Sequence, residues 1–222
     1  HPTVWFCAED VEPLILHSEP LPDRLLVYGC EGAGKTRALA QWLGLRVLEA
    51  TGSGHIIGCT SPTEPRAEEI REAIAEMLPA HWWTWNERRR TYHFANGCRV
   101  QVRSTHQQSK EAGSRLQSLN WRAVACDEIQ DCLKADPDIE MRGRKAPGGR
   151  YKRFCTATSK DSPDFRTWRD KRLAGKLWGK RTIIGPLQPF QWPDFWEEKI
   201  ETLDKREYRR RILAEDLPPE NR

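Results

Sequence analysis

The sequence predicts an α/β fold in which helices cover both faces of a mostly parallel sheet that carries a β-hairpin insertion. Short apolar runs typical of strands alternate with stretches of helical periodicity, and this alternation favours a parallel sheet. A glycine-rich loop joins the first strand to the first helix, and a later strand ends in two acidic residues. With 222 residues, 38% of them hydrophobic, the chain is long enough for one such domain and a small appendage.

The first half of the chain contains four predicted elements. They are a strand at residues 25–28, a helix from Lys35 to about Glu49, a strand at 55–60 and a helix at about 64–78. In both helices the apolar residues recur three or four positions apart, which places them on one buried face.

A β-hairpin is expected next. Tyr92 and Phe94 alternate with polar residues, and Asn96-Gly97 is a strong signal for a hairpin turn. The preceding cluster Trp82-Trp83-x-Trp85 is interpreted as aromatic cover for the neighbouring helix and hairpin, in preference to a platform on which bases stack.

The second half continues the alternation of strands and helices. Strands are expected at 123–126, 154–157 and 182–184, and helices at 194–203 and 205–214. These elements predict a core over residues 1–185 and a C-terminal helical lid or linker over residues 186–222.

The loop after the first strand has the sequence of a phosphate-binding loop. Gly29 to Thr36 fits G-x-x-x-x-G-K-[ST], the Walker A pattern of P-loop NTPases. Glycines allow the backbone N–H groups to turn toward a phosphate, with the positive end of the following helix behind them. The residues predicted to bind ATP are Gly29, Gly32, Ala33, Gly34, Lys35 and Thr36. Lys35 would hold the β- and γ-phosphates, and the Thr36 hydroxyl would hold Mg²⁺.

A second motif lies about ninety residues further on. The apolar strand Ala123-Val-Ala-Cys126 ends in Asp127-Glu128, a Walker B pattern. Asp127 would hold Mg²⁺, and Glu128 would activate the attacking water as general base. The two motifs together predict a RecA-like, ASCE-type P-loop NTPase that hydrolyses ATP. The hydroxyls of Thr156 and Thr158 end another strand, where they would sense the γ-phosphate or simply form an ordinary strand terminus.

Net charge and cysteine content indicate the cellular environment of the protein. The net charge is +4, the seven cysteines form no C-x-x-C pair, and no apolar run approaches the ~20 residues needed to span a bilayer. These observations argue against zinc and a membrane, and favour a reducing, cytoplasmic setting. Two basic clusters are candidates for DNA contact: Arg88, Arg89 and Arg90, and Arg142, Arg144 and Lys145. A solvated loop explains each cluster equally well.

These motifs together resemble the ATPase domain of viral large terminases, the motors that package DNA. The resemblance covers nearly the whole chain. It rests on the two motifs above and on Ser61-Pro-Thr63, the hairpin turn Phe94-Ala-Asn-Gly97, the segment Gly113 to Gln117, Thr156-Ala-Thr158 and the tail from Lys205 to Glu215.

The resemblance implies an ATPase that moves double-stranded DNA into a procapsid. It further implies a homo-oligomeric ring, a pentamer, on a portal protein, with a small terminase subunit as partner and the host cytoplasm as location. Thr156 and Thr158 would couple loss of the γ-phosphate to movement. The nuclease domain of the family has no room here, so we expect an excised ATPase domain.

The chain departs from the family inside the glycine loop. Many terminases carry an arginine or lysine there, whereas this chain has Cys30-Glu31. We therefore expect an arginine finger in trans from a neighbouring subunit, with Arg115 as the candidate. A plain surface role for Arg115 is the alternative.

Two other functions are compatible with the motifs. Asp127-Glu-Ile-Gln130 and Thr156-Ala-Thr158 also resemble motifs in the first RecA-like lobe of a superfamily 2-type nucleic-acid helicase, although the second lobe is missing. A non-catalytic assembly protein that holds ATP as a structural ligand is the third possibility, and Glu128 argues against it.

Overall fold

The computed structural model describes residues 23–50, 54–105, 120–143, 151–158, 162–183, 201–211 and 213. The strands are β1 (Arg24–Gly29), β2 (Ile56–Ser61), β3 (Trp83–Asn86), β4 (Thr91–Phe94), β5 (Arg99–Ser104), β6 (Ala123–Cys126), β7 (Lys152–Thr158) and β8 (Trp178–Ile183). The helices are α2 (Lys35–Glu49), α3 (Glu64–Met77), α5 (Asp136–Arg142), α6 (Pro163–Leu173) and α8 (Lys205–Arg211), with short 3₁₀ turns η1 (Ala80–Trp82), η2 (Ile129–Asp131) and η3 (Leu133–Ala135).

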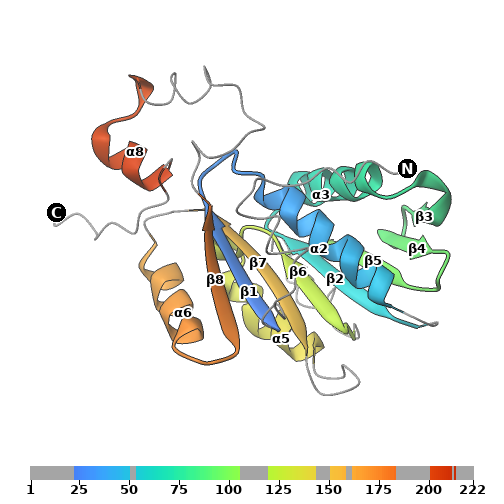
Figure 1. The fold of residues 1–222 in the computed structure, drawn as a ribbon. Helices are drawn as coiled ribbons and strands as arrows, with labels where there is room; N and C mark the ends of the chain where they lie inside the picture. The colour runs from blue at the N-terminus through green and yellow to red at the C-terminus, as the bar shows by residue number, and fades with distance from the viewer. Residues whose placement is uncertain are drawn as a thin grey trace.

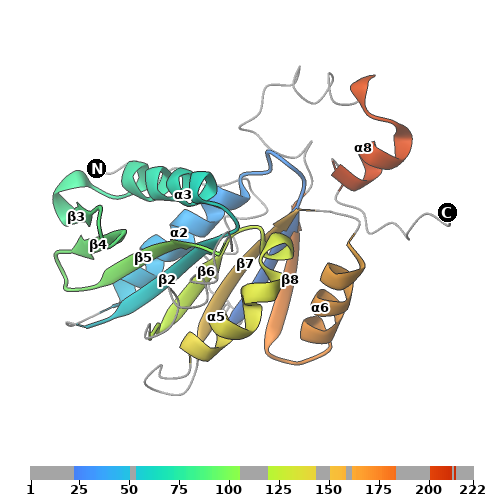
Figure 2. The same cartoon turned by 180° about the vertical axis from the view of Figure 1, so that it is seen from behind.

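All eight strands belong to one sheet in the order β3-β4-β5-β2-β6-β7-β1-β8. Strands β5, β2, β6, β7, β1 and β8 run parallel, whereas β4 pairs antiparallel with both β3 and β5. Figure 1 shows α2 and α3 on one face, and Figure 2 shows α5 and α6 on the other. The predicted fold, a mostly parallel α/β sheet with a hairpin insertion, is confirmed.

Strand β1 contributes to a core on each face of the sheet. Leu25 and Val27 belong to the cluster beneath α2 and α3, whereas Leu26 and Tyr28 belong to the cluster beneath α5 and α6. Successive side chains of a strand point to opposite faces, so a strand covered on both sides must be apolar at every position. The continuous apolar run of β1 therefore fits its place in the sheet.

Helices α2 and α3 have the buried faces expected from their periodicity. Leu39, Trp42 and Leu43 of α2 are buried, as are Ile70 and Ile74 of α3. The Thr63 side chain caps α3 by accepting a hydrogen bond from the backbone N–H of Arg66, and proline occupies the first turn. Serine, threonine and aspartate favour this cap position because their oxygens satisfy otherwise unpaired N–H groups.

The predicted hairpin is formed by β4 and β5, with Gly97 at a φ of 81°. The Asn96 side chain donates hydrogen bonds to the carbonyls of Val47 and Ala50, at 2.7 and 3.2 Å, so the turn also closes the end of α2. Trp83 and Trp85 form the additional strand β3, which the sequence did not predict. Their rings lie 5.0 and 4.7 Å from the ring of Tyr92, and both pack against the core, which agrees with the interpretation as aromatic cover.

One glycine is required by a close approach within the sheet layer. A Cβ on Gly58 of β2 would lie 2.3 Å from Cδ2 of Trp121. Trp121 is fully buried, and its indole N–H donates a 2.9 Å hydrogen bond to Gln101 of β5. Because the ring is buried and held by this hydrogen bond, it cannot easily move aside for a larger residue at position 58.

Several elements differ from the sequence prediction. Strand β8 begins at Trp178, earlier than the predicted 182–184, and neither α5 nor α6 was predicted. Helix α6 buries few residues, chiefly Phe165 and Arg169, so its hydrophobic periodicity is weak. Its Ser162-Pro163 start is nevertheless a helix-start signal. The helix predicted at 205–214 is observed as α8, whereas the one predicted at 194–203 lies mainly outside the described residues.

Nothing in the structure tests the proposed boundary between residues 185 and 186. Within the described residues, no helix has the length and apolar character needed to cross a bilayer.

Candidate nucleotide-binding site

The strand order brings the sequence motifs together at one edge of the sheet. Strand β7 pairs with β1 on one side and with β6 on the other, and all three are parallel. Their carboxyl ends therefore meet, and these ends carry the glycine loop, the two threonines and the two acids. Ligands of open α/β sheets bind outside the carboxyl ends of the strands, and this sheet has its candidate site there.

The glycine loop has the backbone needed to surround a phosphate. Gly32 and Gly34 have φ values of 73° and 77°, in the left-handed region that favours glycine. Helix α2 begins at once with Lys35, so its unpaired N–H groups face the loop. The buried Lys35 ammonium donates to the carbonyls of Gly29 at 3.4 Å and Cys30 at 2.7 Å. This lysine therefore lies inside the loop and adds its charge to the positive end of α2.

Asp127 is a buried carboxylate with one oxygen available for a cation. Its side chain accepts a 2.7 Å hydrogen bond from the Thr156 hydroxyl at Oδ1, whereas Oδ2 is buried without a hydrogen-bond partner among the described residues. Burial raises the pKa of Asp127 to about 6, a rise that the Thr156 hydrogen bond opposes and the nearby Glu128 charge increases. A hard cation such as Mg²⁺ prefers carboxylate and hydroxyl oxygens, so this oxygen of Asp127 fits a magnesium ligand, and the Thr36 hydroxyl at the start of α2 is a second candidate.

Glu128 is fixed in an unusual backbone conformation by strand β7. Its φ of 45° and ψ of 56° lie in the left-handed region, which is strained for a residue with a side chain. Its backbone N–H donates to the Thr156 hydroxyl at 2.9 Å. The same hydroxyl therefore joins the backbone of Glu128 to the carboxylate of Asp127.

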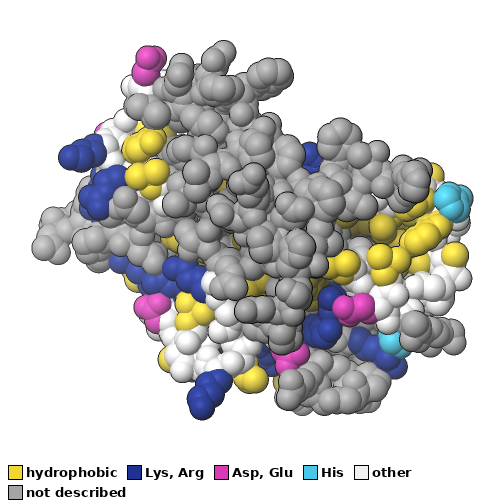
Figure 3. Space-filling model, in the orientation of Figure 1, with side chains coloured by type: hydrophobic (Ala, Val, Ile, Leu, Met, Phe, Trp, Pro, Cys, Tyr) yellow, Lys and Arg dark blue, Asp and Glu magenta, His cyan; other side chains and the backbone are white. Residues whose placement is uncertain are grey.

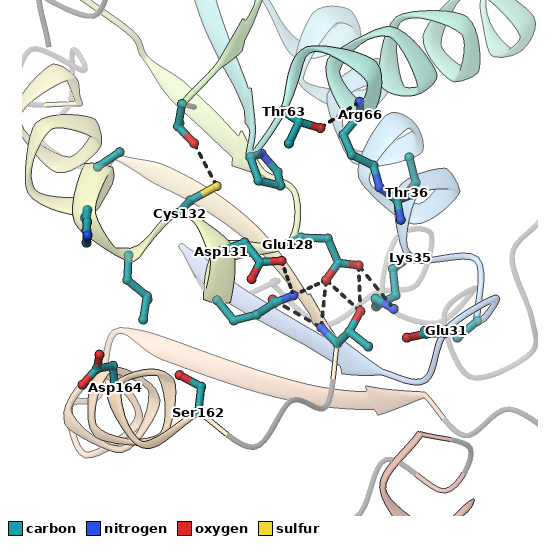
Figure 4. Close-up of a pocket in the computed structure, with 18 of the residues that line it drawn as sticks. Glu31, Lys35, Thr36, Thr63, Arg66, Glu128, Asp131, Cys132, Ser162 and Asp164 are labelled. Atoms are coloured by element: carbon teal, nitrogen blue, oxygen red, sulfur yellow. Dashed lines mark hydrogen bonds and ion pairs between the residues drawn. The ribbon is translucent and has the colours of Figure 1, made fainter. Parts of the chain in front are cut away.

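The Glu128 carboxylate is held from three directions (Figure 4). The Thr158 hydroxyl lies 2.7 Å from both of its oxygens, and the Thr158 backbone N–H donates to Oε2 at 3.1 Å. The amide of Gln130 also donates to Oε2. On the remaining side, the Lys35 ammonium lies 3.8 Å from Oε1. The carboxylate of the second motif thus directly faces the lysine of the first.

The motifs line a cavity of about 1090 Å³. It extends from the glycine loop to the first turns of α3 and α6 and to the η2–η3 segment. The sequence analysis did not assign a role to three of its polar residues, Thr63, Arg66 and Gln130. Gln130 follows Glu128 by two positions, and Arg66 follows the Ser61-Pro-Thr63 motif. Thr63 and Gln130 belong to motifs that carried the resemblances, whereas proximity to Ser61-Pro-Thr63 was the only signal for Arg66.

The candidate DNA-binding residues do not form one surface. Arg90 is ion-paired with Glu64 at 3.0 Å and with Glu68 at 3.6 Å, whereas Arg88 and Arg89 are exposed in the β3–β4 turn. The Arg142 carbonyl accepts from the backbone N–H of Trp121, just before β6, so Arg142 lies at the opposite edge of the sheet.

On the face in Figure 3, the described Lys and Arg side chains lie in separate groups, several of them beside acidic side chains. Arg144, Lys145 and the candidate finger Arg115 lie outside the described residues.

Comparison with known proteins shows a likeness in structure but none in sequence. The sequence matches no protein-family profile and no curated protein. The structure is similar to the large terminase of a thermophilic bacteriophage, with a TM-score of 0.75 at 12% identity over 94% of this chain and 53% of that one. The same enzyme has been solved with ATP-γ-S and with ADP. The large terminase of bacteriophage HK97 has a TM-score of 0.65 at 13% identity, over 92% of this chain and 48% of that one.

Two further similar structures are an isolated terminase ATPase domain and a yeast protein. The large terminase ATPase domain of Thermus phage P74-26 is covered over 100% of its length, with a TM-score of 0.60 at 12% identity over 96% of this chain. Dbp5 of Saccharomyces cerevisiae, solved with Nup159, Gle1, IP6 and ADP, has a TM-score of 0.51 at 17% identity, over 80% of this chain and 48% of that one.

This chain therefore has the fold of a large-terminase ATPase domain, as its motifs indicated, and spans about half the length of the full terminases that it resembles.

Proposed function

We propose that this chain is the ATPase of a viral DNA-packaging motor, which hydrolyses ATP with Mg²⁺ and moves double-stranded DNA into a procapsid. One observation carries the ATPase part of the proposal. The Glu128 carboxylate, held by Thr158, faces the Lys35 ammonium at 3.8 Å beside a buried carboxylate with an unpartnered oxygen. The terminase-like fold supports the packaging part.

Each residue has a specific role in hydrolysis. Lys35 and the loop N–H groups from Gly32 to Thr36 bind the phosphates. The oxygen of a water molecule forms a bond to the γ-phosphorus, the bond from that phosphorus to the β–γ bridging oxygen breaks, and ADP leaves with the electron pair. Glu128 accepts the proton of the attacking water as general base. Thr158 and Gln130 hold its carboxylate in place, and one carboxylate oxygen would face the attacking water.

Thr36 and Asp127 would hold the magnesium ion, which when bound neutralises negative charge on the phosphate oxygens. Asp127 must be ionised for this, and its position depends on the hydrogen bond from Thr156. The lysine of the loop keeps the phosphates close to these oxygens. The chain thus supplies a cation on one side of the phosphates and oxygen ligands on the other.

The contacts of Thr156 and Thr158 support a coupling role. Both lie at the carboxyl end of β7, and their hydroxyls contact the two acids that end β6. When the γ-phosphate leaves, the ion pair of Lys35 with Glu128 can re-form. The resulting shift of Glu128 would be passed to β7 through Thr158. We propose that this is how hydrolysis is linked to movement.

The partners follow from the terminase likeness and remain proposals. They are double-stranded DNA, a portal protein, a small terminase subunit and further copies of this chain in a ring, proposed to be a pentamer in the host cytoplasm. Arg88 and Arg89 are the exposed candidates for DNA contact. Arg115 is the candidate finger that a neighbouring subunit would insert.

The alternative function is the first RecA-like lobe of a nucleic-acid helicase. The likeness to Dbp5 favours it, although the TM-score of 0.51 is lower than those of the terminases. Both functions require the same ATP site, so they differ in what the motor does to DNA.

Steady-state ATP hydrolysis, with and without duplex DNA, tests the proposal. We expect turnover that duplex DNA stimulates and that Lys35→Ala abolishes. On a short duplex with a single-stranded tail, the packaging function predicts no strand separation. ATP-dependent unwinding of that substrate would favour the helicase, and turnover unchanged by Lys35→Ala would contradict both.

A further inference from the structure

The glycine loop of this chain supplies one cationic side chain, Lys35, to the cavity. Among the described residues lining the cavity, the other cations are Arg66 and Lys134. Phosphoryl transfer places negative charge on the equatorial oxygens of the γ-phosphate, and a second cation accelerates it strongly. The cavity therefore offers two candidates from the same chain for this charge, in addition to any finger from a neighbour.

Arg66 is placed at the acid end of the cavity by the strand order. It lies in the first turn of α3, which directly follows β2, and β2 is the sheet neighbour of β6. The two strand ends are joined where the Asp127 backbone N–H donates to the Thr60 carbonyl at 2.8 Å. Arg66 thus enters the cavity from the end of β2, and Glu128, the residue after Asp127, enters it from the neighbouring end of β6.

The side chain of Arg66 points across the cavity. In Figure 4 it extends from α3 toward the start of α2, where Thr36 lies. The N-cap of α3 fixes its origin, since the Arg66 N–H donates to Thr63 Oγ1 at 3.4 Å. Lys134 enters from the η3 turn on the side of α5. Arg66 is therefore better placed than Lys134 for a phosphate held between Thr36 and the acids.

Arg66 interacts electrostatically with the acids of the site. Partial burial lowers the pKa of Arg66, but the hydrogen bond from Arg66 to Glu69 and the charges of Glu69, Asp127 and Glu128 together raise it above its usual value. In return, Arg66 lowers the pKa of Asp127. The guanidinium thus interacts with both acids that face the phosphates.

The present partner of Arg66 is easily replaced. Its Nη1 lies 2.7 Å from Oε2 of Glu69, and the two side chains are 48% and 53% exposed. Exposed ion pairs one turn apart on a helix contribute little stability. A phosphate group carries more charge than a carboxylate and accepts two guanidinium hydrogen bonds at once, so it would compete well for Arg66.

We propose that Arg66 is a γ-phosphate-binding arginine in cis, which leaves Glu69 and binds the terminal phosphate of ATP in the same subunit. This proposal rests on the proposed function. It gives the chain an arginine that the Cys30-Glu31 sequence of its loop does not provide. With ADP bound, the terminal phosphate is missing and Arg66 returns to Glu69. Arg66 therefore distinguishes ATP from ADP, independently of a finger from a neighbour.

Binding of two nucleotides to the 222-residue chain tests this proposal. The probes are a non-hydrolysable β,γ-imido analogue of ATP and ADP, each with Mg²⁺ at pH 8, where Asp127 stays ionised. We expect Arg66→Ala to weaken binding of the ATP analogue by about 10- to 100-fold, the effect of one charge-assisted hydrogen-bonding group, and binding of ADP by less than about twofold. Arg66→Lys should lie between the wild type and Arg66→Ala.

The matched control is Arg37→Ala. Arg37 is also about half-exposed, at 47%, and pairs with Glu76 at 3.8 Å, but it does not line the cavity. It should leave both affinities unchanged. Glu69→Gln frees Arg66 and should tighten binding of the ATP analogue alone.

Equal loss for the two nucleotides in Arg66→Ala, or no loss for either, would overturn the role of Arg66. The proposed function fails in a different way. In that case the wild type binds neither nucleotide, or Lys35→Ala binds both as well as the wild type does.

Discussion

The hydroxyl of Thr156 connects the two acids of the site, because it donates to Oδ1 of Asp127 at 2.7 Å and accepts from the backbone N–H of Glu128 at 2.9 Å. Strand β7 therefore sets the position of both acids at the end of β6. A residue that has no direct role in hydrolysis thus controls the two that do, and this relationship gives the first prediction.

Replacement of Thr156 by valine keeps the shape of the side chain and removes the hydroxyl. We expect ATP turnover to fall by about 10- to 100-fold, as is typical when a group that orients a metal ligand is lost. Thr156→Ser keeps the hydroxyl and should retain most activity. Steady-state phosphate release measures both variants. Full activity in Thr156→Val would show that the hydroxyl does not control the acids, and equal losses in both variants would show that it does not act alone.

Asp127 makes the stability of the nucleotide-free chain depend on pH. Its pKa in the fold is about 6, above the ordinary value of 3.8, because burial disfavours the charge. The folded state therefore binds the proton more tightly than the unfolded state does. The contribution of this group is fully favourable below the unfolded value and is lost as the pH rises through about 6.

Without Mg²⁺, Asp127→Asn should therefore raise the midpoint of thermal unfolding at pH 8 and have little effect at pH 4. Thermal unfolding at both pH values, with the same buffer and salt, checks this. Mg²⁺ with ATP should reduce the difference at pH 8 because it stabilises the charged carboxylate of the wild type. If Asp127→Asn is less stable than the wild type at pH 8 without Mg²⁺, the pKa of Asp127 is not raised in the folded state.

Glu128→Gln separates binding from chemistry. The amide cannot accept a proton, so turnover should fall by about 10²- to 10⁴-fold, the usual contribution of a general base. Nucleotide binding should persist because Lys35 and the loop remain. Fluorescent-nucleotide binding and phosphate release distinguish the two effects. Hydrolysis at the normal rate in this variant would revive the structural-ligand hypothesis.

Gly58 tests the packing of the sheet independently of the site. In Gly58→Ala the new methyl group would lie 2.3 Å from the fixed ring of Trp121. Such overpacking typically costs about 1–3 kcal/mol, so the unfolding midpoint should fall by several degrees. Gly175→Ala is the control, since its Cβ would meet only an ordinary 3.6 Å contact with the Arg172 carbonyl. Equal effects of the two substitutions would show that Trp121 moves freely.

Local patterns in the sequence predicted much of the fold. The glycine loop with α2, the position of α3 and the Asn96-Gly97 hairpin were all correct, because turn chemistry and periodicity act over a few residues. Helix α6 was missed because it buries few side chains, so its signal was confined to the Ser162-Pro163 cap. Strand β3 was missed because its tryptophans pack on Tyr92, which follows a turn that the sequence did not indicate.

The sequence by itself determined the residues of the candidate site: the phosphate loop with Lys35, and the acids Asp127 and Glu128. The tertiary structure alone decided their neighbours. It placed Thr158 on the Glu128 carboxylate and brought Arg66 into the same cavity. The physical reason is that local spacing fixes where a strand ends, whereas the order of strands depends on packing across the whole sheet. The pairing of β6 with β7 and β2 selected these residues, and the linear sequence carries no short-range record of that pairing.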